Sequence, residues 1–285
     1  DPDYAAAVEA SVPAGTIEWR GFLPTEQLQR ELGQCAVMLN TPKWNEAFGN
    51  VVVDRTQIGQ DGRLRKYNAV CVCSDGEYVE RGEVPVGLPA GIQPKTLHPN
   101  YRFFDDDRHF FSLRQLAEDA GRPLEDWLYP YQIKLGDGRS FRFGVQLCED
   151  MWCQDYFREG EVLDTLSVYH QRGAEAVFNL SASPWTWQKN DKRNRVVREI
   201  LARSPLPFFY VNQVGAQNNG KNIIVFDGDS TAYTADGTVV RRAEPWRAQL
   251  ILTRDQTEVA PQQNEIEAQY SGCLLYTSPS PRDRG

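Results

Sequence analysis

The chain has 285 residues, with 31 Lys and Arg against 39 Asp and Glu, so its formal net charge is −8. That length suits one large or two small domains, which bury a core without disulfide or metal staples. The acidic balance argues against nucleic acid and anionic membranes as partners. No apolar run approaches the roughly 20 residues that span a bilayer. Six cysteines are too sparse for a disulfide scaffold, so we expect a cytoplasmic protein.

The pattern of residues 1 to 54 is typical of the last part of an α/β unit. Apolar residues at helical spacing come first, and an apolar run of strand length follows at 35–39. Residues 41–53 then read TPKWNEAFGNVVV. This stretch resembles the nucleotide-sugar-binding half of a retaining glycosyltransferase with two Rossmann-like domains. In that family a pair of Glu residues flanks the donor sugar; here Glu46 holds the first position and Asp54 stands at the second. The alternative is an ordinary βα segment with an exposed Glu46.

The pattern changes after Asp54. A turn is predicted at 60–62 and a buried strand at 67–73. Alternating apolar residues mark a strand that ends at Cys148, and strands at 176–180 and 207–211 follow, separated by segments of helical spacing. This strand–helix alternation predicts βαβ units with parallel neighbours. Apolar runs at 223–226, 231–233 and 238–240 predict antiparallel hairpins.

Cys148 is the candidate nucleophile, at the end of its strand in the segment GVQLCEDMW, residues 144–152. A helix is predicted to begin there, and a helix N-terminus favours the thiolate form of a cysteine. A thiolate can attack an amide carbon and form an acyl-enzyme. A cysteine at a strand end is, however, more often a core residue, so the interpretation depends on the other motifs.

Several polar motifs accompany Cys148. Lys95 precedes a Pro-Asn-Tyr turn at 99–101, and taken alone it is an ordinary surface charge. The segment NLSASP, residues 179–184, closes a buried strand with small polar residues, and Lys189 follows on the next predicted helix. In this order the motifs resemble the carbon–nitrogen hydrolase (nitrilase) superfamily. The resemblance is strongest to the glutaminase domain of glutamine-dependent NAD⁺ synthetases and covers residues 58 to 255.

The resemblance implies a fold, a chemistry and a set of site residues. The fold is an α/β four-layer αββα sandwich, usually in homo-oligomers. Cys148 matches the nucleophile, and Lys95 matches the lysine that stabilises the oxyanion of the tetrahedral intermediate. The glutaminase step implies no cofactor and no metal, since ATP and Mg would belong to a ligase domain. The partner is a small-molecule amide, glutamine. The implied substrate-binding residues are Tyr101, Glu149, Trp152, Ser183 and Lys189.

Two departures from the family accompany this resemblance. The family's general-base Glu lies upstream of the turn at 60–62, where this chain carries the glycosyltransferase-like segment. Glu46 has the right chemistry but sits in the wrong motif. In addition, we find no Ser-Gly-Gly phosphate-binding loop. Residues 273–283, CLLYTSPSPRD, resemble a sequencing adapter translated as coding sequence; a disordered Ser/Pro-rich tail is the alternative.

We therefore expect three parts: a glycosyltransferase-like fragment (1–54), a nitrilase-like glutaminase domain incomplete at its N-terminus (58–255), and a disordered or artefactual tail (256–285). The expected activity is hydrolysis of glutamine to supply ammonia for NAD⁺ synthesis, slow or absent because the base is missing. The alternatives are a free-standing nitrilase-type amidase, a glycosyltransferase fragment and an inactive chimeric product. We also predict that Cys148 shares a pocket with Lys95 and is the most reactive thiol.

Overall fold

The computed structural model describes residues 51–249, apart from gaps at 59–63, 75–76, 83–87, 89–90, 102–103, 156, 159–160 and 219–222. Glu46, nearly all of the predicted 1–54 fragment and the predicted tail therefore lie outside the described residues. Within the described part, no helix has the length and apolar character needed to cross a membrane.

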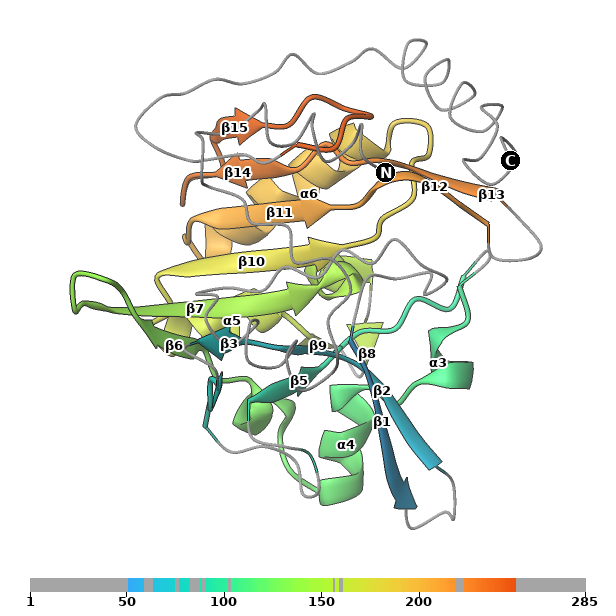
Figure 1. Ribbon diagram of the computed structural model, residues 1–285, viewed down its shortest axis with the longest axis vertical. Helices are drawn as coiled ribbons and strands as arrows, with labels where there is room; N and C mark the ends of the chain where they lie inside the picture. Colours follow the sequence, from blue (N-terminus) through green and yellow to red (C-terminus); the bar gives the residue numbers. More distant parts are fainter. Residues whose placement is uncertain are drawn as a thin grey trace.

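A six-stranded sheet with the order β15-β14-β11-β10-β7-β6 forms the centre of the molecule (Figure 1). Its three central strands, β7 (Ser140–Leu147), β10 (Ala176–Ser181) and β11 (Phe208–Asn212), are parallel. Helix α5 (Thr165–Gln171) connects β7 to β10, and α6 (Lys189–Arg203) connects β10 to β11. The predicted βαβ units are confirmed. Their strands end at one edge of the sheet, where α/β proteins place their sites.

Antiparallel strands flank this parallel centre. Strand β6 (Tyr131–Lys134) pairs with β7 on one side. On the other side β14 (Thr231–Tyr233) pairs with β11 and with β15 (Val239–Arg242). A separate two-stranded sheet joins β12 (Val214–Asn218) to β13 (Ile223–Asp227). These pairs confirm the antiparallel hairpins expected after residue 223.

A second sheet has the order β1-β2-β5 and is antiparallel. Strand β1 (Val51–Ile58) pairs with β2 (Leu64–Cys71), and β2 pairs with β5 (Ile92–Pro94). The boundary predicted at 54–58 therefore falls inside a paired strand, because β1 begins at Val51 and ends at Ile58. Two short strand pairs complete the strands: β3 (Cys73–Ser74) with β4 (Glu77–Tyr78), and β8 (Phe157–Arg158) with β9 (Glu161–Val162).

Alternate side chains of β2 point to opposite faces of its sheet, and one set packs against the six-stranded sheet. Val70 of β2 and Val72, which directly follows the strand, pack against Phe143 and Val145 of β7 in one apolar cluster between the sheets. Their neighbours on β2 belong to a different cluster on the opposite side, against which Leu116 of α4 (Leu113–Ala120) packs. This is the period of two that a strand buried on both faces requires.

Helices α5 and α6 cover the other face of the six-stranded sheet (Figure 1). Leu166 of α5 and Val197 of α6 share a cluster with Val177 of β10, and all three are buried. The resulting order is helix, sheet, sheet, helix, as predicted. Three short helices complete the described elements: α3 (Asp106–His109), η1 (Leu124–Trp127) and η2 (Cys148–Asp155).

Close contact between α5 and β7 depends on Gly144. A Cβ atom built at Gly144 would overlap the ring of Tyr169, so only glycine allows the ring to lie on the strand here. The Tyr169 hydroxyl reaches Oε1 of Gln93 at 2.8 Å and the carbonyl oxygen of Val145 at 2.9 Å. Glycine at this position therefore lets one tyrosine join α5, β5 and β7.

Candidate active site

Cys148 lies where β7 ends and η2 begins, and its backbone is left-handed with φ of 46°. A non-glycine residue in this region stores about 1–3 kcal/mol of strain, and such strain concentrates at functional sites. The carbonyl of Cys148 accepts a hydrogen bond from Nδ2 of Asn179, at 3.3 Å, on the neighbouring strand β10. The turn holds the thiol at the carboxyl edge of the parallel strands.

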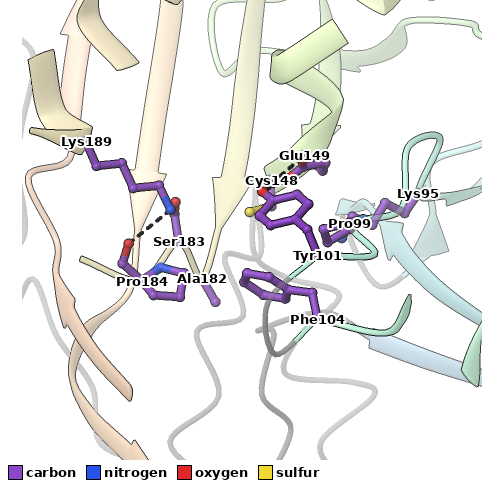
Figure 2. Close-up of a pocket in the computed structure, with 10 residues that line it drawn as sticks. All are labelled: Lys95, Pro99, Tyr101, Phe104, Cys148, Glu149, Ala182, Ser183, Pro184 and Lys189. Carbon is purple, nitrogen blue, oxygen red and sulfur yellow. Dashed lines mark hydrogen bonds between the residues drawn. The ribbon is translucent and has the colours of Figure 1, made fainter. Parts of the chain in front are cut away.

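A small cavity lies beside this thiol. The volume available to the centre of a water molecule is about 10 Å³, so the cavity has room for roughly one water. Figure 2 shows two walls, one with Cys148, Lys95 and Tyr101 and the other with Ser183 and Lys189. The cavity is lined by Lys95, Pro99, Tyr101, Phe104, Cys148, Glu149, Ala182, Ser183, Pro184 and Lys189. The structure thus brings six of the seven predicted site residues to one place.

Lys95 is 1% exposed, so the interpretation as a solvated surface charge is wrong. Its ammonium lies 2.8 Å from Oδ2 of Asp106, in an ion pair that is itself buried. Burial lowers the pKa of Lys95, but Asp106 and the Cys148 thiol more than offset this and leave the pKa raised. The ammonium therefore stays charged inside the protein. Sequence reasoning did not identify Asp106 as the partner of Lys95, although the acidic run at 105–107 indicated a source of negative charge.

Glu149 directly follows the nucleophile and is 4% exposed. Its carboxylate accepts a hydrogen bond from the Tyr101 hydroxyl, at 3.1 Å to Oε1 and 3.2 Å to Oε2 (Figure 2). Tyr101 itself is 47% exposed, so this bond joins a surface ring to a buried carboxylate at the mouth of the cavity. The pair closes the cavity next to Cys148.

The opposite wall is held by Asn212 at the end of β11. Its Oδ1 accepts from the Ser183 N–H at 2.8 Å, and its Nδ2 donates to the Ser183 carbonyl at 3.2 Å. Lys189, the first residue of α6, donates to the Pro184 carbonyl at 3.0 Å. Burial lowers the pKa of Lys189 to about 8. Asn212 was not singled out in the sequence, because its role depends on β11 lying beside β10.

Helix α6 is anchored one turn further along by Arg193, which is 1% exposed. Its guanidinium forms a buried ion pair with Asp229 and donates to the Tyr210 hydroxyl at 3.1 Å. Asp229 has a left-handed backbone with φ of 51°. This ion pair ties the N-terminal half of α6 to the segment after β13, and so sets where Lys189 enters the cavity.

Burial raises the pKa of the Cys148 thiol, and the charge of Glu149 adds to this. The ammonium groups of Lys95 and Lys189 lower the pKa, but by less than burial raises it. The expectation that the pKa of Cys148 is lowered is therefore wrong. The predicted helix is a 3-10 helix kinked at Trp152, so the segment that follows the sulfur is not the regular α-helix that the expectation invoked. Burial raises the pKa of Cys153 further, to about 12.

The seventh predicted residue, Trp152, lines a neighbouring groove of about 940 Å³ instead of the small cavity. The two spaces share Tyr101, Glu149 and Lys189. His98 also lines the groove, and its Nδ1 lies 2.8 Å from Oδ1 of Asp107.

In the part of the chain that the structure describes, no group of three or more His, Cys, Asp or Glu side chains is arranged to hold a metal ion. The ionisable groups around Cys148 are paired with each other or with backbone instead. The chemistry that these residues support is thus that of a thiol beside two ammonium groups.

Comparison with known proteins identifies relatives of the chain. No protein-family model matches it. A glutamine-dependent NAD(+) synthetase of Synechocystis is 26% identical over 233 residues, which cover 80% of this chain and 35% of that protein. The corresponding protein of Rhodobacter capsulatus is 30% identical over 222 residues, covering 76% and 33%. The chain therefore spans about a third of the length of these relatives.

Among solved structures, the glutamine-dependent NAD+ synthetase of Acinetobacter baumannii superposes with a TM-score of 0.56 at 24% identity, covering 80% of this chain and 36% of that one. The layered sheets and this superposition show an α/β fold shared with that synthetase, which confirms the predicted fold class. The chain is homologous to the glutamine-dependent NAD(+) synthetases, which are enzymes.

Proposed function

We propose that this chain hydrolyses the side-chain amide of glutamine, with Cys148 as nucleophile. The observation that supports this best is the meeting of Cys148 and Lys95. A strained, left-handed cysteine and a fully buried ammonium line one small cavity at the carboxyl edge of the sheet. A core cysteine would need neither the strain nor the buried charge, each of which costs stability.

The reaction follows from these groups. The thiol loses its proton, and the sulfur attacks the amide carbon, whose oxygen gains the negative charge. The Lys95 ammonium stabilises this oxyanion, held in place by Asp106. The C–N bond then breaks, the nitrogen gains a proton, and ammonia leaves a thioester on Cys148. Water attacks the thioester and releases glutamate and the free thiol.

The other wall of the cavity suits the amino-acid end of the substrate. Lys189 brings a positive charge into a mostly buried position, where it donates a hydrogen bond to a neutral acceptor, the Pro184 carbonyl. An α-carboxylate is the charge-assisted acceptor that such an ammonium favours. Ser183, fixed by Asn212, is positioned for the α-amino end. This charge favours glutamine over the simple amides that a free-standing amidase takes.

The proton acceptor limits the expected rate. Glu149 is the carboxylate next to Cys148, but its oxygens already accept the Tyr101 hydroxyl. Glu46, the other candidate, lies outside the described residues. General-base catalysis contributes about 10² to 10⁴ in rate, so we expect slow turnover from the chain by itself.

The ammonia is proposed to serve NAD⁺ synthesis, because the relatives named above are glutamine-dependent NAD(+) synthetases. On this proposal ATP and Mg act in the ligase step, the glutaminase step needs no cofactor, and the protein works in the cytoplasm as a homo-oligomer. Neither nucleic acid nor a membrane is a proposed partner.

Measurement of glutamate release from glutamine tests the proposal, with acetamide as the comparison substrate. We expect Cys148→Ala to abolish release and Lys95→Met to lower kcat by about 10²-fold or more, because the oxyanion loses its counter-charge. Cys71→Ala, which removes a half-buried thiol at the end of β2, is the matched control and should keep wild-type activity. Activity that survives Cys148→Ala, or faster turnover of acetamide than of glutamine, contradicts the proposal.

A further inference from the structure

Asp150, two residues after the nucleophile, is 1% exposed and lies outside the lining of the cavity. Its carboxylate accepts three backbone N–H groups from two separate segments. Oδ2 accepts from Leu147 at 2.9 Å, and Oδ1 accepts from Thr96 at 3.0 Å and from Leu97 at 2.8 Å. One buried side chain thus joins the end of β7 to the loop that follows β5.

These three N–H groups lie within two residues of the two reacting residues along the chain. Leu147 directly precedes Cys148, and Thr96 directly follows Lys95. The other side of Lys95 is fixed independently, because its N–H donates to the Asn68 carbonyl at 2.7 Å and its carbonyl accepts from Leu113 at 2.9 Å. Asp150 therefore supplies a direct link between the segment that follows Lys95 and the strained turn that carries the thiol.

We propose that Asp150 is a positioning residue that sets the distance between the Cys148 thiol and the Lys95 ammonium. The proposal rests on the proposed function, in which these two groups react together. Asp150 acts through the two segments that it holds and does not touch the substrate. A carboxylate suits this task, because one oxygen accepts two N–H groups while the other accepts a third, and burial shields all three bonds from water.

The test variant is Asp150→Asn, which keeps the shape and one acceptor oxygen but faces an N–H of the backbone with an NH₂ group. The readout is the pH dependence of Cys148 alkylation by iodoacetamide, followed by mass spectrometry of its peptide. Removal of a nearby negative charge by itself moves the alkylation midpoint to lower pH. Displacement of Lys95 moves it to higher pH, by about one unit, because the thiolate loses its counter-charge. We expect the upward shift.

Two further variants test whether the upward shift of the Cys148 midpoint arises from displacement of Lys95. Asp164→Asn is the matched control, because Asp164 also accepts a backbone N–H, that of Ser167, at the start of α5; it should leave the Cys148 midpoint unchanged. In a Lys95→Met background, Asp150→Asn should raise the midpoint no further. A downward shift, no shift, or an equal shift without Lys95 overturns the proposal.

Glutamine kinetics provide a separate arm. Asp150→Asn should lower kcat by about 10-fold or more while KM stays within about threefold, because Ser183 and Lys189 are not displaced. If the wild-type chain does not hydrolyse glutamine, the proposed function fails, whereas the alkylation midpoints still decide the role of Asp150.

Circular dichroism and thermal melting check that Asp150→Asn is folded. If the variant is not folded, a pH titration of the wild-type protein followed by NMR tests the proposal. The amide protons of Leu147, Thr96 and Leu97 should then shift with one common pH midpoint, because one carboxyl group accepts all three. Separate midpoints, or no titration of any of the three, overturn the proposal.

Discussion

At the scale of a residue, the proposed role of Lys189 predicts that glutamine binding depends on pH. Burial lowers its pKa to about 8, so the ammonium is present below that pH and is lost as the pH rises through it. A carboxylate bound by Lys189 therefore loses its partner in alkaline solution. We expect KM for glutamine to rise above pH 8, approaching about tenfold per pH unit, and Lys189→Arg to flatten that rise because arginine stays protonated. Steady-state kinetics from pH 6.5 to 9.5 measure this.

Lys192→Arg is the matched control for this prediction. Lys192 lies on the same helix, with its ammonium 5.1 Å from the centre of the Trp152 ring, and lines the groove but not the small cavity. Its variant should keep the wild-type profile. Deprotonation of the free amino acid affects every variant equally, so identical profiles for Lys189→Arg and the wild type contradict the prediction.

At the scale of an element, α5 packs on β7 only because residue 144 has no side chain. In Gly144→Ala the new methyl group overlaps the Tyr169 ring, which cannot move freely because its hydroxyl lies 2.8 and 2.9 Å from two acceptor oxygens. We expect the free energy of unfolding to fall by about 1–3 kcal/mol, the usual cost of overpacking a core. Urea unfolding measures it.

Gly136→Ala controls for the intrinsic effect of exchanging glycine for alanine. A Cβ atom at Gly136 meets no atom within 4 Å, and the residue lies in the turn between β6 and β7. Its unfolding free energy should stay within about 0.5 kcal/mol of the wild type. Equal effects of the two substitutions would show that Tyr169 adjusts to the methyl group.

At the scale of the whole molecule, two observations weigh against a break in the fold at residue 54. Strand β1 crosses it and pairs with β2. The match to the Synechocystis relative spans 233 residues, more than the stretch from 58 to 255, so homology extends beyond that stretch. Apart from residues 51–54, the glycosyltransferase and adapter resemblances concern residues outside the described part, and both stay predictions.

Truncation and proteolysis test this division. We expect a chain that starts at Val51 to melt within a few degrees of the full chain, because it keeps the β1-β2-β5 sheet. Trypsin should cut the full chain first between residues 55 and 65 and after Gln262. Uniform protection across residues 45 to 65, together with a large loss of melting temperature on truncation, would show one continuous domain and contradict a chimeric chain.

The sequence by itself determined the order of the parallel strands and the place of Cys148 at a strand end. Both follow from local periodicity, since apolar alternation in 141–147 and helical spacing after it are properties of neighbouring residues. The motifs around Lys95, Ser183 and Lys189 were predicted from their resemblance to a family, and the structure places them around one cavity.

Only the tertiary structure decided which charges meet. Asp106 pairs with Lys95, and Asp150 accepts N–H groups from a loop that lies far from it in the chain. The direction of the Cys148 pKa shift also depended on the fold, because burial outweighs the two lysines there. Desolvation and Coulomb interactions depend on neighbours in space and on the exclusion of water, and neither is a property of a short segment of sequence.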